Sequence, residues 1–155
     1  MKTIVYIDGL TEPVNPGGIT TYAFVVYREG KKVYEERKFV GSGKDFSNNV
    51  AEYSALYAAL KWLIANGQTD EVEIRSDSKL LVNQMRGEWE ARKGLYIQTY
   101  EKVKQLLSSF KNISFRWVPR EENQEADRLS RLAYSEYIGK HKGQKLFSGN
   151  GWKQV

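Results

Sequence analysis

Three acidic residues occupy positions where the surrounding pattern predicts an apolar or neutral side chain. Asp8 follows the apolar run 4–7 and marks the predicted end of a strand. Asp77 follows the alternating stretch 71–76, a second predicted strand, directly before a helix begins. Glu52 lies on a helix face that otherwise holds alanine and leucine, where a carboxylate costs desolvation free energy unless something compensates for it.

Each of these acids also has an ordinary structural explanation. Asp8 precedes a glycine and is a suitable turn residue. Glu52 stands in the first turn of its helix, where the helix dipole favours an acid that points to solvent. Asp77 could cap the following helix through its side chain. Taken singly, each acid can therefore be explained without a functional role.

Taken together, the three acids favour one shared site. Ligands in open α/β sheets bind at the carboxyl ends of strands, which is where two of the acids are predicted to lie. Carboxylates that share a site stay ionised only when a cation neutralises them. The chain has no cysteine and one histidine, and a site of oxygen ligands alone favours Mg²⁺ or Mn²⁺. The sequence therefore predicts a divalent-metal site.

The elements that would position these acids change in type along the chain. Periodicity, caps and turn residues predict strands over 3–8, 19–28, 32–40, 71–76 and 113–118, and helices over 48–65, 78–86, 95–109 and 122–137. An asparagine is expected to cap the first helix. The order βββαβααβα predicts an α/β fold in which one mixed sheet carries helices on its faces.

Size and charge bound the remaining possibilities. The 155 residues fit one domain, and they contain no apolar run of membrane-spanning length, no signal-peptide pattern and no cysteine, so we expect a cytoplasmic protein. Four of the five net positive charges fall in 139–155, a stretch without acids. We expect 1–138 to form the domain and 139–155 a loosely ordered basic tail, so that charge alone says little about a nucleic-acid partner.

Four segments of the chain, in order and spacing, carry a family resemblance: "YIDG…NPGG", "SNNVAEYSALYAAL", "RSDS" and "WVPREENQEADRLSR". They resemble the signature segments of type 1 ribonuclease H, most closely its compact, archaeal-like branch without the basic protrusion, and the match runs from residue 3 to about 137. The resemblance implies the ribonuclease H-like fold, a five-stranded mixed β-sheet flanked by α-helices. It also implies the catalytic acids Asp8, Glu52, Asp77 and Asp127. Only the resemblance points to Asp127, which lies off the apolar stripe of its own helix.

The implied activity is endonucleolytic hydrolysis of the RNA strand of RNA–DNA hybrids with two Mg²⁺ or Mn²⁺ ions. Asp8 would bridge both ions, Glu52 and Asp77 would complete one site, and Asp127 would complete the other. Whether double-stranded RNA is also cut is left open, and a monomer is expected. Two alternatives on the same fold remain: a catalytically weak module that binds hybrid or double-stranded RNA, and a 3′–5′ exonuclease.

The resemblance further implies the residues that contact the substrate. Those expected to read the 2′-hydroxyl groups of RNA are Gly9, Leu10 and Asn15 in the first loop and Asn48 and Asn49 at the start of the first helix. The two asparagines of the helix start could equally be caps. Ser47 stands where the family often places a contact to a DNA phosphate.

The chain departs from the family pattern at several positions. Leu10 stands where a small residue is usual, and Lys79 replaces a common glutamine. The connection 119–123 lacks the histidine found in many bacterial members. In place of the basic protrusion the chain has only a short segment, in which Trp89, Arg92 and Lys93 are candidate substitutes. These differences concern affinity and rate more than the type of reaction.

Overall fold

The computed structural model describes residues 2–141 and confirms the predicted order of the main elements. The strands are β1 (Lys2–Glu12), β2 (Gly17–Arg28), β3 (Lys31–Gly43), β4 (Glu71–Ser76) and β5 (Ile113–Trp117). The α-helices are α1 (Asn48–Ala65), α2 (Lys79–Met85), α3 (Ile97–Leu106) and α4 (Gln124–Lys140), with short 3-10 turns at Leu107–Ser109 and Arg120–Glu122. The expectation of a loosely ordered tail concerns residues that lie almost entirely outside the described part.

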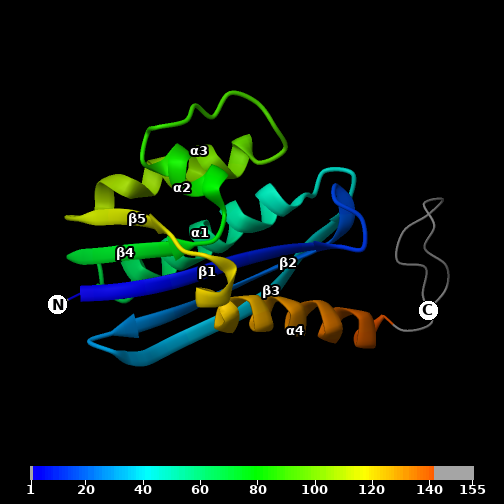
Figure 1. Cartoon of the computed structure of the whole chain (residues 1–155), viewed down its shortest axis with the longest axis horizontal. Helices are drawn as coiled ribbons and strands as arrows, with labels where there is room; N and C mark the ends of the chain where they lie inside the picture. Colours follow the sequence, from blue (N-terminus) through cyan, green and yellow to red (C-terminus); the bar gives the residue numbers. More distant parts are fainter. Residues whose placement is uncertain (1, 142–155) are drawn as a thin grey trace.

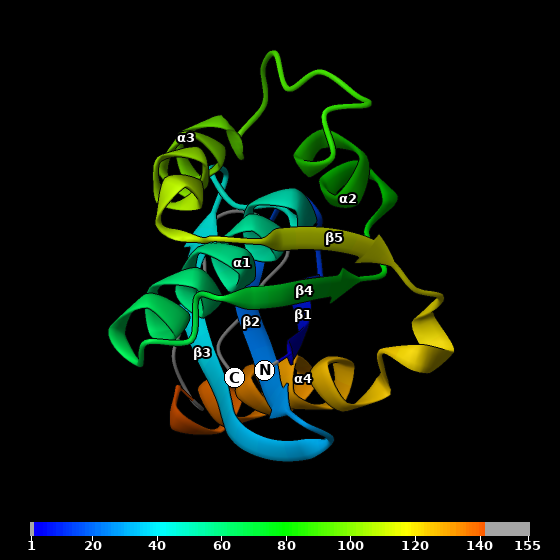
Figure 2. The same ribbon diagram turned by 90° about the vertical axis from the view of Figure 1, so that its left-hand side faces the viewer.

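The strands form one mixed sheet in the order β3-β2-β1-β4-β5. β1, β2 and β3 pair in antiparallel fashion, whereas β4 runs parallel to both β1 and β5. Helices α1, α2 and α3 lie on one side of the sheet and α4 lies alone on the other, as Figures 1 and 2 show. The predicted five-stranded mixed sheet with flanking helices is therefore confirmed.

The main core lies between the sheet and α1, and it explains the apolar stripe of that helix. Apolar side chains of β1 and β2 pack there against Leu56, Leu60 and Leu63. The opposite face has a smaller core, in which Ala23 and Val25 of β2 meet α4. β2 is thus covered on both faces, and the sheet is a rigid base for residues at its centre. No helix within residues 2–141 combines the length and apolar character needed to cross a membrane.

The first strand is longer than predicted, and this changes the position of Asp8. β1 stays paired with β2 as far as Glu12, which lies opposite Ile19, so Asp8 is a residue in the middle of a strand. The expectation that Asp8 ends the strand, with Gly9 and Leu10 in a loop, is wrong. The Pro- and Gly-rich turn begins only after Glu12, because alternate burial and β2 pairing continue to that point.

Asp8 nevertheless lies beside a gap in the sheet, where β1 no longer pairs with β4. The parallel pairing of β1 with β4 ends at Tyr6, which lies opposite Arg75, so β1 continues alone on that side. Asp77 comes two residues after Arg75, where β4 has just ended. The two acids therefore meet where neighbouring parallel strands separate, which is the usual ligand position in such sheets.

Serines cap the two helices that lie beside this gap, in place of the expected asparagine and of Asp77. The Val50 N–H donates to Ser47 Oγ at the start of α1, with a separation of 3.3 Å, so the expected asparagine cap is wrong. The Leu81 N–H donates to Ser78 Oγ at the start of α2, with a separation of 3.2 Å. Because Ser78 supplies this cap, the carboxylate of Asp77 is not used to cap α2.

Candidate metal centre

Three of the predicted acids converge in the structure. One carboxylate oxygen from each of Asp8, Glu52 and Asp77 lies within 4.8 Å of the others. They come from β1, α1 and the end of β4, and they line a groove of about 500 Å³. Asp8 and Glu52 are buried and Asp77 is partly exposed, so Asp77 is the member of the three that reaches solvent.

Gly9 allows α1 to approach β1 closely enough for this convergence. A Cβ atom at position 9 would lie 2.4 Å from the backbone carbon of Ala51 and 2.5 Å from the backbone nitrogen of Glu52. Any side chain at this position would therefore push the helix away from the strand. Because Gly9 has no side chain, Glu52 of α1 can lie beside Asp8, the residue that precedes Gly9 in β1.

The electrostatics of the cluster follow from burial and mutual repulsion. Burial and then the charge of Asp77 raise the pKa of Asp8 to about 8. Burial, with Asp8 and then Asp77 adding repulsion, also raises the pKa of Glu52 well above its usual range. The pKa of Asp77 is raised by burial as well, although hydrogen bonding to Asn123 and the positive charge of Arg120 oppose that shift. Without a cation the cluster therefore resists full ionisation.

The donor set fits a hard divalent cation. Glu52 Oε2 is buried and has no hydrogen-bond partner within residues 2–141, a costly arrangement for a carboxylate oxygen. A cation held by this oxygen and by those of Asp8 and Asp77 would satisfy it and would offset the repulsion. Carboxylate oxygens alone are ligands of the kind that Mg²⁺ and Mn²⁺ take.

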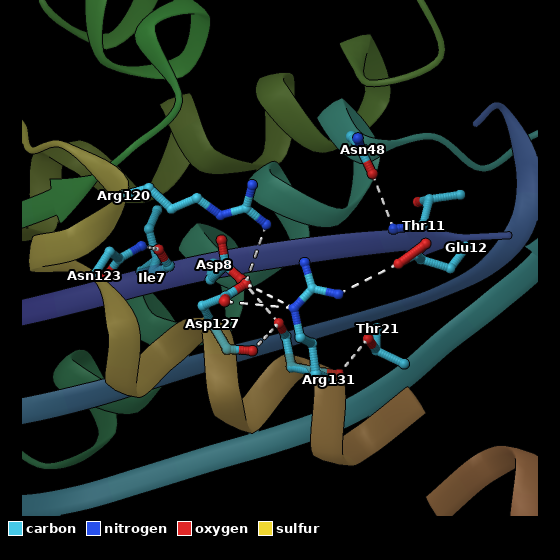
Figure 3. Close-up of polar contacts among 11 residues, drawn as sticks. Ile7, Asp8, Thr11, Glu12, Thr21, Asn48, Arg120, Asn123, Asp127 and Arg131 are labelled. Carbon is cyan, nitrogen blue, oxygen red and sulfur yellow. Dashed lines mark hydrogen bonds and ion pairs between the residues drawn. The ribbon is translucent and has the colours of Figure 1, made fainter. Parts of the chain in front are cut away.

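The fourth predicted acid, Asp127, lies across the groove on α4 and outside this group of three. Its carboxylate is near enough to Asp8 to raise the pKa of Asp8 through both charge and hydrogen bonding. Arginines border it: Arg131 Nε lies 3.3 Å from Asp127 Oδ1 and Arg120 Nη2 lies 3.8 Å from the same oxygen (Figure 3). Asp8 therefore stands between two acids on one side and one on the other.

Two polar residues that position Asp8 were missed in the sequence. Ser130 Oγ, fully buried on α4, lies 2.8 Å from Asp8 Oδ2 and donates to it, which lowers the pKa that burial raises. Asn123 Nδ2 donates to the carbonyl oxygen of Ile7 at 2.8 Å and so ties the start of α4 to β1 (Figure 3). A signal for Ser130 existed, because it is a polar residue on the buried stripe of α4.

The predicted substrate residues form a connected group at the start of α1. The Thr11 N–H donates to Asn48 Oδ1 at 2.9 Å, and the Asn48 N–H donates to Asn15 Oδ1 at 3.0 Å. Ser47 is the cap described above, and Asn49 is the second residue of α1. These contacts join β1 and the β1–β2 connection to the helix beside the groove. A role for these residues in binding substrate stays a prediction.

The departures from the family pattern also have places in the structure. Leu10 is buried at the groove wall, and Lys79 Nζ lies 5.0 Å above the ring of Trp117. Trp117 lines the groove and donates through Nε1 to the carbonyl oxygen of Asp77 at 3.1 Å. Trp117 is thus a further groove residue that the sequence did not single out.

The segment proposed to replace a basic protrusion lies after α2. Trp89 is half exposed, and both Arg92 and Lys93 are exposed. Arg92 pairs with Glu90. Contact of these side chains with nucleic acid stays a prediction.

Comparisons with known proteins found a matching family and several similar proteins. The family described as reverse transcriptase-like matches residues 21–133. The bifunctional protein Rv2228c of Mycobacterium tuberculosis is 37% identical over 131 residues, which cover 84% of this chain and 35% of that protein. Ribonuclease HI of Halobacterium salinarum is 34% identical over 128 residues, covering 83% of this chain and 62% of that protein. The chain therefore spans about a third of the mycobacterial relative's length.

Solved structures agree with the sequence comparisons. The N-terminal RNase H domain of Rv2228c, solved as a fusion with maltose-binding protein, superposes with a TM-score of 0.80 at 31% identity and covers 90% of this chain and 97% of that one. LC11-RNase H1, solved in complex with an RNA/DNA hybrid, has a TM-score of 0.80 at 32% identity and covers 88% of this chain and 99% of that one. Both comparisons account for most of the chain.

Proposed function

This chain belongs to the type 1 ribonuclease H family, as its four sequence segments predict, and on that premise we propose that it cuts the RNA strand of RNA–DNA hybrids internally. Residues 1–138 would be the catalytic domain and 139–155 a basic extension. The convergence of Asp8, Glu52 and Asp77 on one groove is the observation that carries the proposal.

The four acids would hold two divalent cations, Mg²⁺ or Mn²⁺. Asp8 would contribute to both sites, Glu52 and Asp77 to one, and Asp127 to the other. The cations, when bound, would supply a nucleophilic water at neutral pH and offset charge on the phosphate that is cut. The orphaned oxygen of Glu52 supports the first of these sites.

The protein's own residues would fix the geometry of the acids. The hydroxyl of Ser130 holds one oxygen of Asp8, which restricts the orientation of that carboxylate. The Asn123 side chain fixes the backbone just before Asp8 through the carbonyl of Ile7. Preorganised ligands avoid a reorganisation cost when charge develops during reaction.

Specificity for hybrid would come from the residues at the start of α1. Asn48 lines the groove and its backbone N–H donates to Asn15 Oδ1, and both side chains would meet 2′-hydroxyl groups. Gly9, Leu10 and Asn49 would complete that contact, and Ser47 would contact a DNA phosphate.

A cleavage assay on matched substrates tests the proposal. Internally labelled RNA–DNA hybrid, RNA duplex and DNA duplex of one sequence are incubated with Mg²⁺ or Mn²⁺, with Asp8→Asn as the control protein. We expect internal cuts in the RNA of the hybrid, dependent on the cation and absent with the control. Release of single nucleotides from ends would favour the exonuclease, and tight binding without cuts would favour a binding module.

The basic extension is predicted to compensate in part for the missing protrusion. A chain that ends at residue 138 loses Lys140, Lys142, Lys145 and Lys153. Because each lysine near a phosphate releases counterions on binding, we expect this chain to show a KM for hybrid raised about three- to ten-fold at low salt, a shallower salt dependence and a nearly unchanged kcat. Equal KM values for both chains across a salt titration would refute the prediction.

A second protein separates loss of charge from loss of length. In the full chain, Lys142, Lys145 and Lys153 are replaced together by glutamine, and α4, which ends at Lys140, is left intact. Because three of the four lysines are neutralised, most of the rise in KM is expected if charge is responsible.

A further inference from the structure

Asp127 differs from the other three acids because arginine side chains already pair with its carboxylate. Arg131 Nε lies 3.3 Å from its Oδ1 and 3.4 Å from its Oδ2, and Arg120 Nη2 lies 3.8 Å from Oδ1. Within residues 2–141, Asp127 is the one acid of the four that forms a salt bridge. Arg120 and Arg131 line the groove together with Asp127.

Arg131 is held in place by a second acid. Its Nη1 lies 3.3 Å from Oε1 of Glu12, the last residue of β1, while its Nε contacts Asp127 in the first turns of α4. One guanidinium therefore joins the strand to the helix across the groove, as Figure 3 shows. The rigid fork of arginine suits this double contact, because its donors point at both carboxylates at once.

We propose that Arg131 is a positioning residue that competes with the second divalent cation for Asp127. The inference rests on the proposed function. In the absence of nucleic acid, the protein binds one cation at Asp8, Glu52 and Asp77 and binds the second more weakly. A cation that approaches Asp127 must displace the Arg131 guanidinium and meets the positive charge of Arg120 nearby.

A nucleic-acid substrate relieves this competition. A backbone phosphate in the groove offers Arg131 a charge-assisted, bidentate acceptor in place of Asp127. Once Arg131 turns to the phosphate, the oxygens of Asp127 are free for a cation. Substrate and second cation then strengthen each other's binding, and thermodynamic linkage requires the effect to be equal in both directions.

Calorimetric titration with Mn²⁺ of the nucleic-acid-free protein tests this. An ion pair that is partly exposed contributes little free energy, so Arg131→Gln is expected to tighten the second binding event about 1.4- to five-fold and to leave the first unchanged. Arg131→Lys keeps a positive charge but loses the fork that contacts Asp127 and Glu12 together, so it is expected to fall between wild type and Arg131→Gln. Arg128→Gln removes the same charge from an exposed position of the same helix and serves as the matched control.

A double substitution isolates the pair. Asp127→Asn is expected to abolish the gain of Arg131→Gln, because the gain requires the freed carboxylate. An unchanged or weakened second event in Arg131→Gln, or a second event absent from both proteins, would overturn the inference. An equal gain in Arg128→Gln would assign the effect to net charge and would also overturn it. Thermal unfolding in EDTA confirms that each variant is folded.

The same titration separates failure of this inference from failure of the proposed function. If wild type binds no divalent cation, or binds it as well after Asp8→Asn, the metal-dependent function itself is wrong. If wild type binds cations in a manner that depends on Asp8 and Arg131→Gln changes nothing, only the role of Arg131 is wrong.

Discussion

Asp8→Asn is expected to have opposite effects on activity and stability. Cleavage of hybrid should fall about a thousand-fold, the range expected when a central electrostatic group is removed. In the cation-free protein, the same change should raise the free energy of unfolding at pH 7 by about 4 kcal/mol, since a pKa near 8 makes an ionised Asp8 costly in the folded state. The asparagine keeps an oxygen that can accept the hydrogen bond from Ser130.

The sign of the pH dependence follows from the two pKa values. Asp8 has a pKa of about 8 when folded and an ordinary value of 3.8. Below about pH 4 the group is protonated in both states, so wild type and Asp8→Asn should be equally stable. Between pH 4 and 8 the unfolded chain releases a proton that the folded chain retains, so wild type loses stability as pH rises and the variant does not lose this contribution.

Urea unfolding in EDTA at pH 4, 5, 6, 7 and 8 measures this difference. The gap between the two proteins should grow steadily over that interval. Asp70→Asn, which removes an exposed acid outside the groove, is the matched control and should show no comparable gap. Parallel stability curves for wild type and Asp8→Asn would contradict the electrostatic description of the site. Saturating Mg²⁺ should stabilise wild type far more than the variant.

Local sequence patterns were sufficient for the order of the elements and for singling out three acids that converge in the structure. The acids Asp8, Glu52 and Asp77 stand out because each interrupts a pattern of apolar or alternating residues, and burial makes such interruptions expensive. The helix 48–65 and the strand 71–76 were predicted at the bounds that the structure gives them. Their periodicity is strong, and capping or turn residues mark their ends.

Contacts between distant segments explain what the sequence pattern did not reveal. Asp127 has no unusual local pattern, and its place near Asp8 depends on how α4 crosses the sheet. The role of Ser130 depends on the same crossing, since its partner lies 122 residues away in the sequence. The end of β1 was misplaced because glycine after Asp8 looks like a turn, whereas in the structure it permits a close contact with α1.

Gly9→Ala is expected to be among the most damaging single changes outside the acids. The added methyl group would lie 2.4–2.5 Å from the backbone of Ala51 and Glu52, atoms that cannot rotate away. Either β1 or α1 must move, so we expect a loss of about 3 kcal/mol in the free energy of unfolding, at the upper end for an overpacked site. The same movement separates Glu52 from Asp8, and kcat should fall together with the affinity for the first cation.

Gly139→Ala is the matched control, because a Cβ atom at position 139 of α4 meets nothing within 4 Å. Alanine there should be neutral or stabilise the helix by about 0.5–1 kcal/mol. Adding Ala51→Gly to Gly9→Ala removes one clashing atom but leaves the backbone clash, so it should restore only part of the lost stability. A Gly9→Ala protein with wild-type unfolding and cation binding would show that contact between β1 and α1 does not set the distance between the acids. Full rescue by Ala51→Gly would mean that the side chain of Ala51, and not the helix backbone, limits that contact.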